Sequence, residues 1–148
     1  DGTSRELLHE IDEEEGRRQW ATRLVTANVI AELASVEPAA VAPHLPELVT
    51  VLDPESDDVG VMTTVADTVA TVAEHDPNMV DGAVEPLVAV LGHDDRPTVA
   101  TAVTALGFLG DPRAVEPLRA LEADERRSPE LRELAAETAT FVAQRSEQ

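Results

Sequence analysis

The chain has 148 residues, of which 43% are hydrophobic, so it is long enough and apolar enough to bury a core within one domain. It carries 30 acidic residues against 11 basic ones, for a net charge of −19, and it contains no cysteine. Disulfides and thiolate metal sites are therefore excluded, and the negative field opposes binding to the phosphate backbone of nucleic acids.

Apolar residues recur at helical spacing along most of the chain and predict helices in pairs. Thr3 and Glu6 have capping-box spacing at the first helix, and Ser128-Pro129-Glu130 favours the start of the last. Trp20 opens the second helix of the first pair, and we expect it in the core or over the open N-terminal end. Residues 145–148 are expected to fray. First helices are expected at about 4–14, 39–52, 79–91 and 112–123, and second helices at about 18–36, 59–75, 97–109 and 129–144.

The segment TALGFLGDPRAVEPLRAL, residues 104–121, contains the junction between two predicted pairs. Gly107 and Gly110 stand near the end of a helix, where a left-handed residue can close it. Asp111 can accept hydrogen bonds from the free N–H groups of the next helix, and Pro112 fits its first turn. The same junction recurs as Glu37-Pro38 and Asp76-Pro77.

The apolar positions of the first helices repeat at a fixed interval. Val41, Leu45, Leu48, Val49 and Leu52 recur 39 positions later as Val80, Val84, Leu87, Val88 and Leu91. The second helices repeat with shifts of 34 or 39. A period of this length with two helices per unit predicts an all-α solenoid of about four helical hairpins. The repeats are expected at about 1–37, 38–77, 78–111 and 112–148, in a single domain.

The segment LGDPRAVEPLRALEAD, residues 109–124, preceded by VATAVTALGF, resembles the HEAT repeat in its bilin-lyase-like variant. The resemblance covers roughly 38–144 well and 1–37 more loosely, and it implies a right-handed α-α superhelix. It departs from the family where Thr98-Val99-Ala100 lacks the usual basic residue. The last repeat also lacks the Gly-Asp-Pro ending. That difference is consistent with a terminal cap in which Glu130, Glu133 and Glu137 share one face.

The resemblance implies that other proteins bind along the surface lined by the second helices. The residues of these helices that face outward are therefore the candidate binding surface. A neutral, threonine-rich strip that ends in an aromatic residue predicts a contact patch. Alternatively, threonine is simply a common surface residue here, and Phe108 folds back over the next repeat. The candidates are Asn28, Glu32, Thr64, Asp67, Thr71, Thr98, Thr101, Thr104 and Phe108.

Catalysis is a weaker hypothesis. Deoxyhypusine hydroxylase is a HEAT-repeat enzyme that holds two irons with His-Glu pairs in successive units, whereas this chain has only His9-Glu10. The related pairs His75-Asp76 and His93-Asp94 lie at a helix end and in a loop, at positions that are not equivalent. No residue indicates a chromophore pocket of the bilin-lyase kind. We therefore predict no catalytic residues, no metal site and no cofactor.

The charge pattern resembles that of proteins from salt-accumulating halophiles such as haloarchaea. The acids are spread along the whole chain, and all 11 bases are arginine. Molar salt screens charges beyond about 3 Å, so self-repulsion costs little there. A charge selected for a basic partner is the alternative.

A cytoplasmic location is expected, because cysteine is absent and no apolar run approaches the ~20 residues of a membrane span. We therefore predict no membrane and no nucleic-acid partner. The predicted function is a non-catalytic scaffold or adaptor for protein partners. The alternatives are a catalytic or accessory module related to HEAT-type metal hydroxylases or bilin lyases, and a structural module that forms homo-oligomers through its repeat ends.

Overall fold

The computed structural model describes residue 18 and residues 21–146. Within this part of the chain every regular element is a helix, and no strand occurs, which confirms the all-α prediction. The helix expected at 4–14, the capping box of Thr3 and Glu6, and Trp20 lie outside the described residues.

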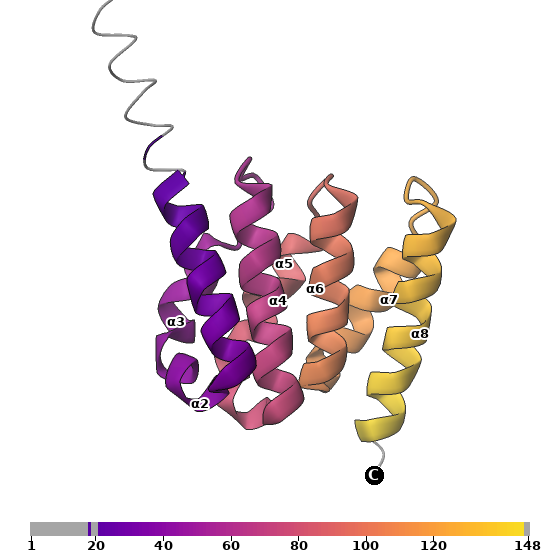
Figure 1. Cartoon of the computed structure of the whole chain (residues 1–148). Coiled ribbons are helices and arrows are strands. Elements are labelled where there is room, and N and C mark those ends of the chain that lie inside the picture. The colour runs from indigo at the N-terminus through magenta and orange to yellow at the C-terminus, as the bar shows by residue number, and fades with distance from the viewer. Residues whose placement is uncertain (1–17, 19–20, 147–148) are drawn as a thin grey trace, which may run out of the picture.

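The long helices lie side by side in one layer, which we call the long-helix layer (Figure 1). It contains the helix of residues 21–36, α4 (Val59–His75), α6 (Arg96–Leu109) and α8 (Pro129–Ser146). The second helices predicted at 59–75 and 97–109 are thus confirmed. The last helix continues through Ser146, two residues beyond its predicted end at 144.

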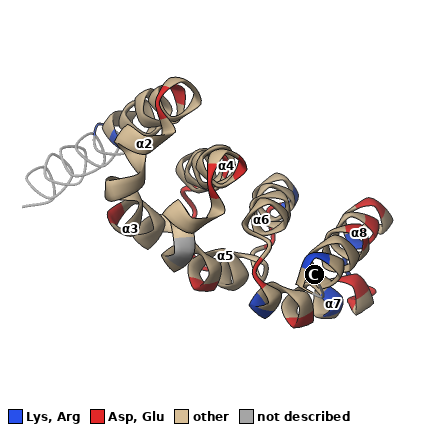
Figure 2. Cartoon of the chain, turned by 90° about the horizontal axis from the view of Figure 1, so that it is seen from below, with Lys and Arg blue, Asp and Glu red and all other residues tan. Residues whose placement is uncertain are grey.

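A second layer packs behind the first and contains the shorter helices (Figure 2). Its α-helices are α2 (Pro38–Val41), α3 (Leu45–Leu48), α5 (Val84–Val90) and α7 (Val115–Ala123). Between or before them lie the 3-10 turns η1 (Ala42–His44), η2 (Val49–Val51), η3 (Pro77–Ala83) and η4 (Pro112–Ala114).

Proline explains why the first helices, predicted as continuous, are broken in the structure. Pro43 and Pro46 have no N–H to donate within a helix, so the chain restarts helical turns at these points. In α5 and α7 the prolines Pro86 and Pro117 fall in the first turn, where a missing N–H costs little. The helices predicted at 79–91 and 112–123 therefore begin with 3-10 turns.

Small and branched aliphatic side chains fill the core between the two layers. The largest fully buried side chains include Met62, Leu87, Leu106 and Leu118, which come from α4, α5, α6 and α7. Gly107 is also buried, and a Cβ added there would lie only 3.1 Å from Cγ2 of Thr138 on α8. The glycine therefore permits a close approach of α6 and α8.

Two of the three predicted junctions are capped as expected. Asp76 accepts a hydrogen bond from the N–H of Asn78, and Asp111 accepts one from the N–H of Arg113, at 3.0 and 2.9 Å. Glu37 makes no side-chain capping bond. Gly110 ends α6 in the left-handed conformation, with φ of 65°, as the sequence predicts.

Loops of neighbouring hairpins are joined by hydrogen bonds. The Nδ1 atom of His93 accepts from the N–H of Asp95 at 2.9 Å, so the proton is on Nε2. Nε2 then donates to the carbonyl of Ser56 at 2.7 Å, across 37 residues. Arg23 similarly pairs with Asp58 at 3.1 Å, across 35 residues. Both intervals fall within the period predicted from the sequence, so the contacts link successive units of the stack.

Candidate functional site

The exposed face of α6 carries almost no charge. Its only charged residue is Arg96, at the first position, although 28% of the chain is charged. The ribbon of α6 is accordingly largely tan in Figure 2. Thr101 is half-buried on this face, and Thr104 and Phe108 are exposed. The face is therefore the least charged part of the long-helix layer on the side turned away from the core.

Internal hydrogen bonds make this face less polar than its threonines suggest. The hydroxyl groups of Thr101 and Thr104 donate to the carbonyls of Pro97 and Ala100, at 2.9 and 3.1 Å. Each hydroxyl therefore uses its one hydrogen within its own helix. The surface that remains presents methyl groups and acceptor oxygens. On α4, Thr64 and Thr71 donate in the same way to Gly60 and Asp67.

A groove of about 280 Å³ runs between α6 and α8. Phe108 and Phe141 line it from the two helices and remain 38% and 49% exposed. These are the only phenylalanines in the chain, and together with Trp20 they are its only aromatic residues. The full lining is Thr104, Gly107 and Phe108 from α6, with Leu134, Glu137, Thr138, Phe141 and Arg145 from α8.

The charged groups of the groove are few and belong to α8. The guanidinium carbon of Arg145 lies 5.5 Å from the ring centroid of Phe141, within the range of a cation–π contact. The hydroxyl of Thr138 donates to the carbonyl of Leu134 at 2.7 Å and is not a free donor. The groove is thus apolar, with one cation and the Glu137 carboxylate at its edges. Such a surface suits an apolar side chain of a partner.

Residues 78–140 match the family model for HEAT repeats. The match supports a HEAT-repeat family, and HEAT repeats commonly mediate protein–protein interaction. It spans α5, α6 and α7 and α8 as far as residue 140, so the groove residues Phe141 and Arg145 lie just beyond the matched region. The chain has no significant match among curated proteins or among solved structures.

One predicted surface residue of the matched region is not on the surface. Thr98 is fully buried, so its assignment to the exposed strip was wrong. It lies in the first turn of α6, where its hydroxyl donates to Asp95 at 2.5 Å. The same oxygen lies 3.0 Å from the hydroxyl of Thr63 on α4. Thr98 is therefore buried where α6 packs against α4 and does not face a partner.

The other predicted residues lie on the long-helix layer but do not form one site. Thr104 and Phe108 line the groove, and Thr101 lies one turn before Thr104 on α6. Phe108 also lies against α8 of the next hairpin, so part of the alternative prediction holds, yet its ring stays accessible. The residues outside the groove are Asn28 and Glu32 on the first helix and Thr64, Asp67 and Thr71 on α4.

The contribution of α8 to the groove was not predicted from the sequence. The shared face predicted for Glu130, Glu133 and Glu137 is exposed, as expected. Phe141 and Arg145, which line the groove beside α6, were not among the predicted residues. The scarcity of aromatic residues was the available signal, because Phe141 is the only aromatic residue of α8.

The described residues form neither a metal site nor a membrane span. In this part of the chain no group of three or more histidine, aspartate or glutamate residues is placed to hold a metal ion. His75 is exposed at the end of α4, and His93 is bonded to the loops as described above. None of the described helices combines the length and apolar character that crossing a membrane requires.

Proposed function

We propose that the chain is a non-catalytic scaffold or adaptor that binds a protein partner through the groove between α6 and α8. The observation that carries the proposal is the exposure of Phe108 and Phe141 beside one groove, in a chain whose described core is mostly valine, leucine and alanine. Aromatic side chains near the centre of an interface supply much of its binding energy. Two accessible phenyl rings on adjacent helices therefore suit a partner contact.

The surroundings of the groove support the same role. Interface centres are depleted in charge and surrounded by a polar rim. The nearly uncharged face of α6 continues the apolar surface, while exposed Asp67 and Glu74 on α4 give a charged edge on the neighbouring helix. We infer that the partner inserts an apolar side chain between the two phenyl rings.

We also propose an architecture for the whole chain and a cellular environment in which it functions. We infer one domain of about four hairpins stacked as a right-handed solenoid, with repeats of the bilin-lyase-like type. The recurring intervals in the loop contacts and in the apolar pattern support this architecture. A charge of −19 without lysine or cysteine supports a setting in the cytoplasm of a salt-accumulating halophile, with no nucleic-acid partner.

Capture of partners at high salt tests the groove. The wild-type chain is immobilised in parallel with the double variant Phe108→Ala/Phe141→Ala, and bound proteins are compared by quantitative mass spectrometry. We expect at least one protein to be enriched on the wild type and reduced about tenfold or more on the double variant, since losing two aromatic anchors costs well over 1.4 kcal/mol.

A matched control is the double variant Glu85→Ala/Glu116→Ala, which trims two exposed side chains on α5 and α7 in the opposite layer instead. This control should retain the same proteins as the wild type. Circular dichroism verifies that each variant is folded. If the set of captured proteins is unchanged by loss of both phenyl rings, the groove is not the contact surface.

Self-association is a second candidate function, favoured by a separate observation. Four exposed apolar side chains lie on the helix of residues 21–36, at the N-terminal end of the described stack: Val25, Val29, Leu33 and Val36. An exposed apolar surface of this kind can mediate contact between copies. Sedimentation in molar potassium chloride should then show a dimer that Val25→Gln/Val29→Gln converts to a monomer. A wild type that sediments as a monomer at all concentrations contradicts this candidate.

A further inference from the structure

Large apolar side chains line the outer side of the helix of residues 21–36, at the N-terminal end of the described stack (Figure 1). We call them the end stripe: Val25, Val29, Leu33 and Val36. They recur every three or four residues, so they share one side of the helix, and they are 43–76% exposed. Ala27 and Ala34 are buried on the other side, where the helix packs into the stack. A helix that is apolar on two sides is typical of a position with neighbours on both sides.

The internal repeat shows which element covers this side in the later hairpins. Shifts of 39 and then 34 residues relate the end stripe to four positions on α6: Thr98, Ala102, Leu106 and Leu109. All four are buried, and the Thr98 hydroxyl lies 3.0 Å from that of Thr63 on α4. On α4 the equivalent of Val25 is Thr64, whose hydroxyl lies 3.4 Å from the side-chain oxygen of Asn28. The neighbour on this side is thus the preceding long helix, and the end stripe is shaped for a helix of the same kind.

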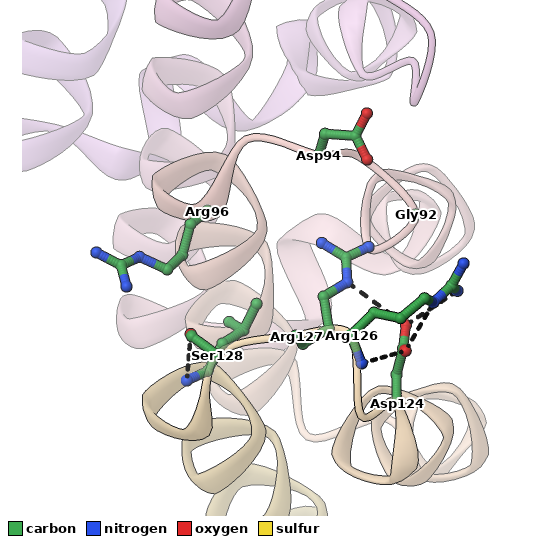
Figure 3. Close-up of a pocket in the computed structure, with 8 residues that line it drawn as sticks. Gly92, Asp94, Arg96, Asp124, Arg126, Arg127 and Ser128 are labelled. Carbon is green, nitrogen blue, oxygen red and sulfur yellow. Dashed lines mark hydrogen bonds and ion pairs between the residues drawn. The ribbon is translucent and has the colours of Figure 1, made fainter.

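The loops of the later hairpins, in contrast, bind one another. They line a polar cavity of about 340 Å³ between the α5–α6 loop and the α7–α8 loop. Asp124 pairs there with both Arg126 and Arg127, at 3.0 and 3.6 Å (Figure 3). Arg127 also donates to the carbonyls of Leu91 and His93, at 3.0 and 2.7 Å. These charged groups hold neighbouring hairpins together and offer nothing to an apolar helix.

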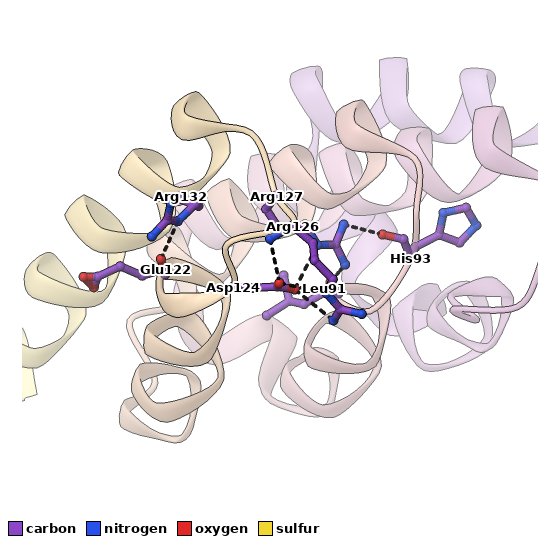
Figure 4. A network of polar contacts seen from close by, with 7 residues as sticks. All are labelled: Leu91, His93, Glu122, Asp124, Arg126, Arg127 and Arg132. Carbon is purple, nitrogen blue, oxygen red and sulfur yellow. Dashed lines mark hydrogen bonds and ion pairs between the residues drawn. The ribbon is translucent and has the colours of Figure 1, made fainter.

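The opposite end of the stack is polar. Arg119 pairs with Glu122 at 2.8 Å and donates to the hydroxyl of Thr140 at 3.1 Å. Arg132 donates to the carbonyl of Glu122 at 2.8 Å (Figure 4). Among the described residues of this last hairpin, Phe141 is the only large apolar side chain that is exposed, and it lines the groove beside α6. A head-to-tail contact would therefore bring the end stripe against a charged surface.

We propose that the end stripe binds the end stripe of a second copy, so that two stacks meet through their first long helices in an antiparallel, two-fold contact. An apolar surface that matches itself closes such a dimer, because the same patch is used on both copies. This proposal rests on the self-association candidate described above and specifies its geometry. In molar salt the charge of −19 on each copy is screened beyond about 3 Å, so that two acidic copies can approach.

The charges beside the end stripe favour the antiparallel direction. Arg18 precedes the stripe, whereas Glu32 and Glu37 lie toward its far end, and all three are exposed. Antiparallel pairing places Arg18 of one copy toward Glu32 and Glu37 of the other. Parallel pairing places like charges side by side, which is unfavourable.

Disulfide trapping tests this geometry, and the chain suits the method because it contains no cysteine. Val29→Cys and Leu33→Cys are made separately, their association is measured by sedimentation in molar potassium chloride, and each is then oxidised. A two-fold contact brings these positions close to the same stripe of the other copy, so at least one variant should form a covalent dimer on its own. Ala123→Cys is the matched control, because it is exposed on the last hairpin, and it should stay monomeric on oxidation.

The outcomes separate the geometry from self-association itself. A wild type that sediments as a dimer while neither stripe variant is trapped alone would overturn the two-fold contact and leave self-association standing. A wild type that is monomeric at every concentration would overturn both. The variant Phe108→Ala/Phe141→Ala should keep the dissociation constant of the dimer within twofold of the wild type, because the groove takes no part in the contact. A tenfold loss in that variant, with folding verified by circular dichroism, would place the contact in the groove and overturn the proposal.

Discussion

Two threonines on the same helix differ in burial because their hydroxyl groups contact different neighbours. Thr98 and Thr101 stand one turn apart on the same helix, yet one is fully buried and the other is half-buried at the surface. The difference comes from Asp95 and Thr63, which surround the Thr98 hydroxyl. Buried hydroxyl groups persist only where they are hydrogen-bonded. Stability should therefore depend on Thr98 far more than on Thr101.

Replacing Thr98 with valine tests this difference. Thr98→Val keeps the shape but removes the hydroxyl that donates to Asp95, and we expect a loss of about 1–2 kcal/mol in the free energy of unfolding. Thr101→Val removes a hydroxyl that bonds only within its own helix and should change stability by less than about 0.5 kcal/mol. Urea unfolding measures both variants. Equal effects would contradict the assigned role of Thr98.

A second substitution tests the backbone at the end of α6. Gly110 has φ of 65°, and a residue with a Cβ is strained there, so Gly110→Ala should cost about 1 kcal/mol. Gly82→Ala is the control, because its φ is not positive and an added Cβ meets no atom within 4 Å. Thermal unfolding should separate the two variants by several degrees. A smaller loss at Gly110 than at Gly82 would show that the left-handed ending is not required.

At the scale of elements, the short helices depend on caps and prolines more than on length. Several of them have only one or two turns, which are marginal without tertiary contacts. Their starts are fixed by proline and, at two of three junctions, by an aspartate cap. The third junction has Glu37, whose side chain makes no capping bond. The three junctions should therefore differ in their sensitivity to substitution.

Alanine substitution at two junctions tests this expectation. Asp111→Ala removes an N-cap and should cost about 1 kcal/mol, whereas Glu37→Ala should be close to neutral. Chemical unfolding at neutral pH measures both variants. Matching losses at the two junctions would mean that the capping bond of Asp111 contributes little.

The contribution of Asp111 should also depend on pH. The hydrogen bond from the Arg113 side chain lowers the pKa of Asp111 in the folded state below its ordinary value of about 3.9. A lowered folded pKa stabilises the protein above the unfolded pKa, and this stabilisation is lost as pH falls through the folded value. The difference between wild type and Asp111→Ala should be constant near neutral pH and shrink below about pH 4. A difference that grows on acidification would contradict this assignment.

The positions of the long helices could be predicted from the sequence, because the spacing of their apolar residues and the residues that favour helix ends indicate the same bounds. α4 begins and ends at the expected residues, and Gly110 closes α6 as expected. The groove could be predicted only in part. Helical spacing placed Thr104 and Phe108 outward, but the position of Phe141 beside them depends on how closely α6 and α8 pack. That approach depends on Gly107 meeting Thr138, a contact between residues of different hairpins.

At the scale of the whole molecule, the high net negative charge contrasts with the low charge of the α6 face. A charge of −19 opposes compaction unless salt screens it, whereas the face of α6 is nearly uncharged. In molar salt the long-range field is screened, and contact then depends on apolar complementarity. The low charge of α6 and the high charge of the chain are thus both compatible with the proposed binding function.

Salt dependence of stability tests the effect of the charge. The melting temperature should fall as potassium chloride is reduced below roughly 0.5 M, where screening weakens. A loss of about 2 kcal/mol would lower it by roughly 4–8 °C. The variant Asp67→Asn/Glu74→Gln/Glu85→Gln neutralises three exposed acids and should show a smaller dependence. A melting temperature that stays constant as salt is removed would contradict the halophilic assignment.

Site-specific photo-crosslinking tests the proposed contact surface most directly. A photoreactive phenylalanine is placed at position 108 in the groove, and in a second protein at Ala120, which is exposed on α7 in the opposite layer. Each protein is irradiated in lysate at high salt. Partner binding through the groove predicts discrete crosslinked proteins from position 108 and none from position 120. Crosslinks from position 120 alone, or from neither position, would contradict it.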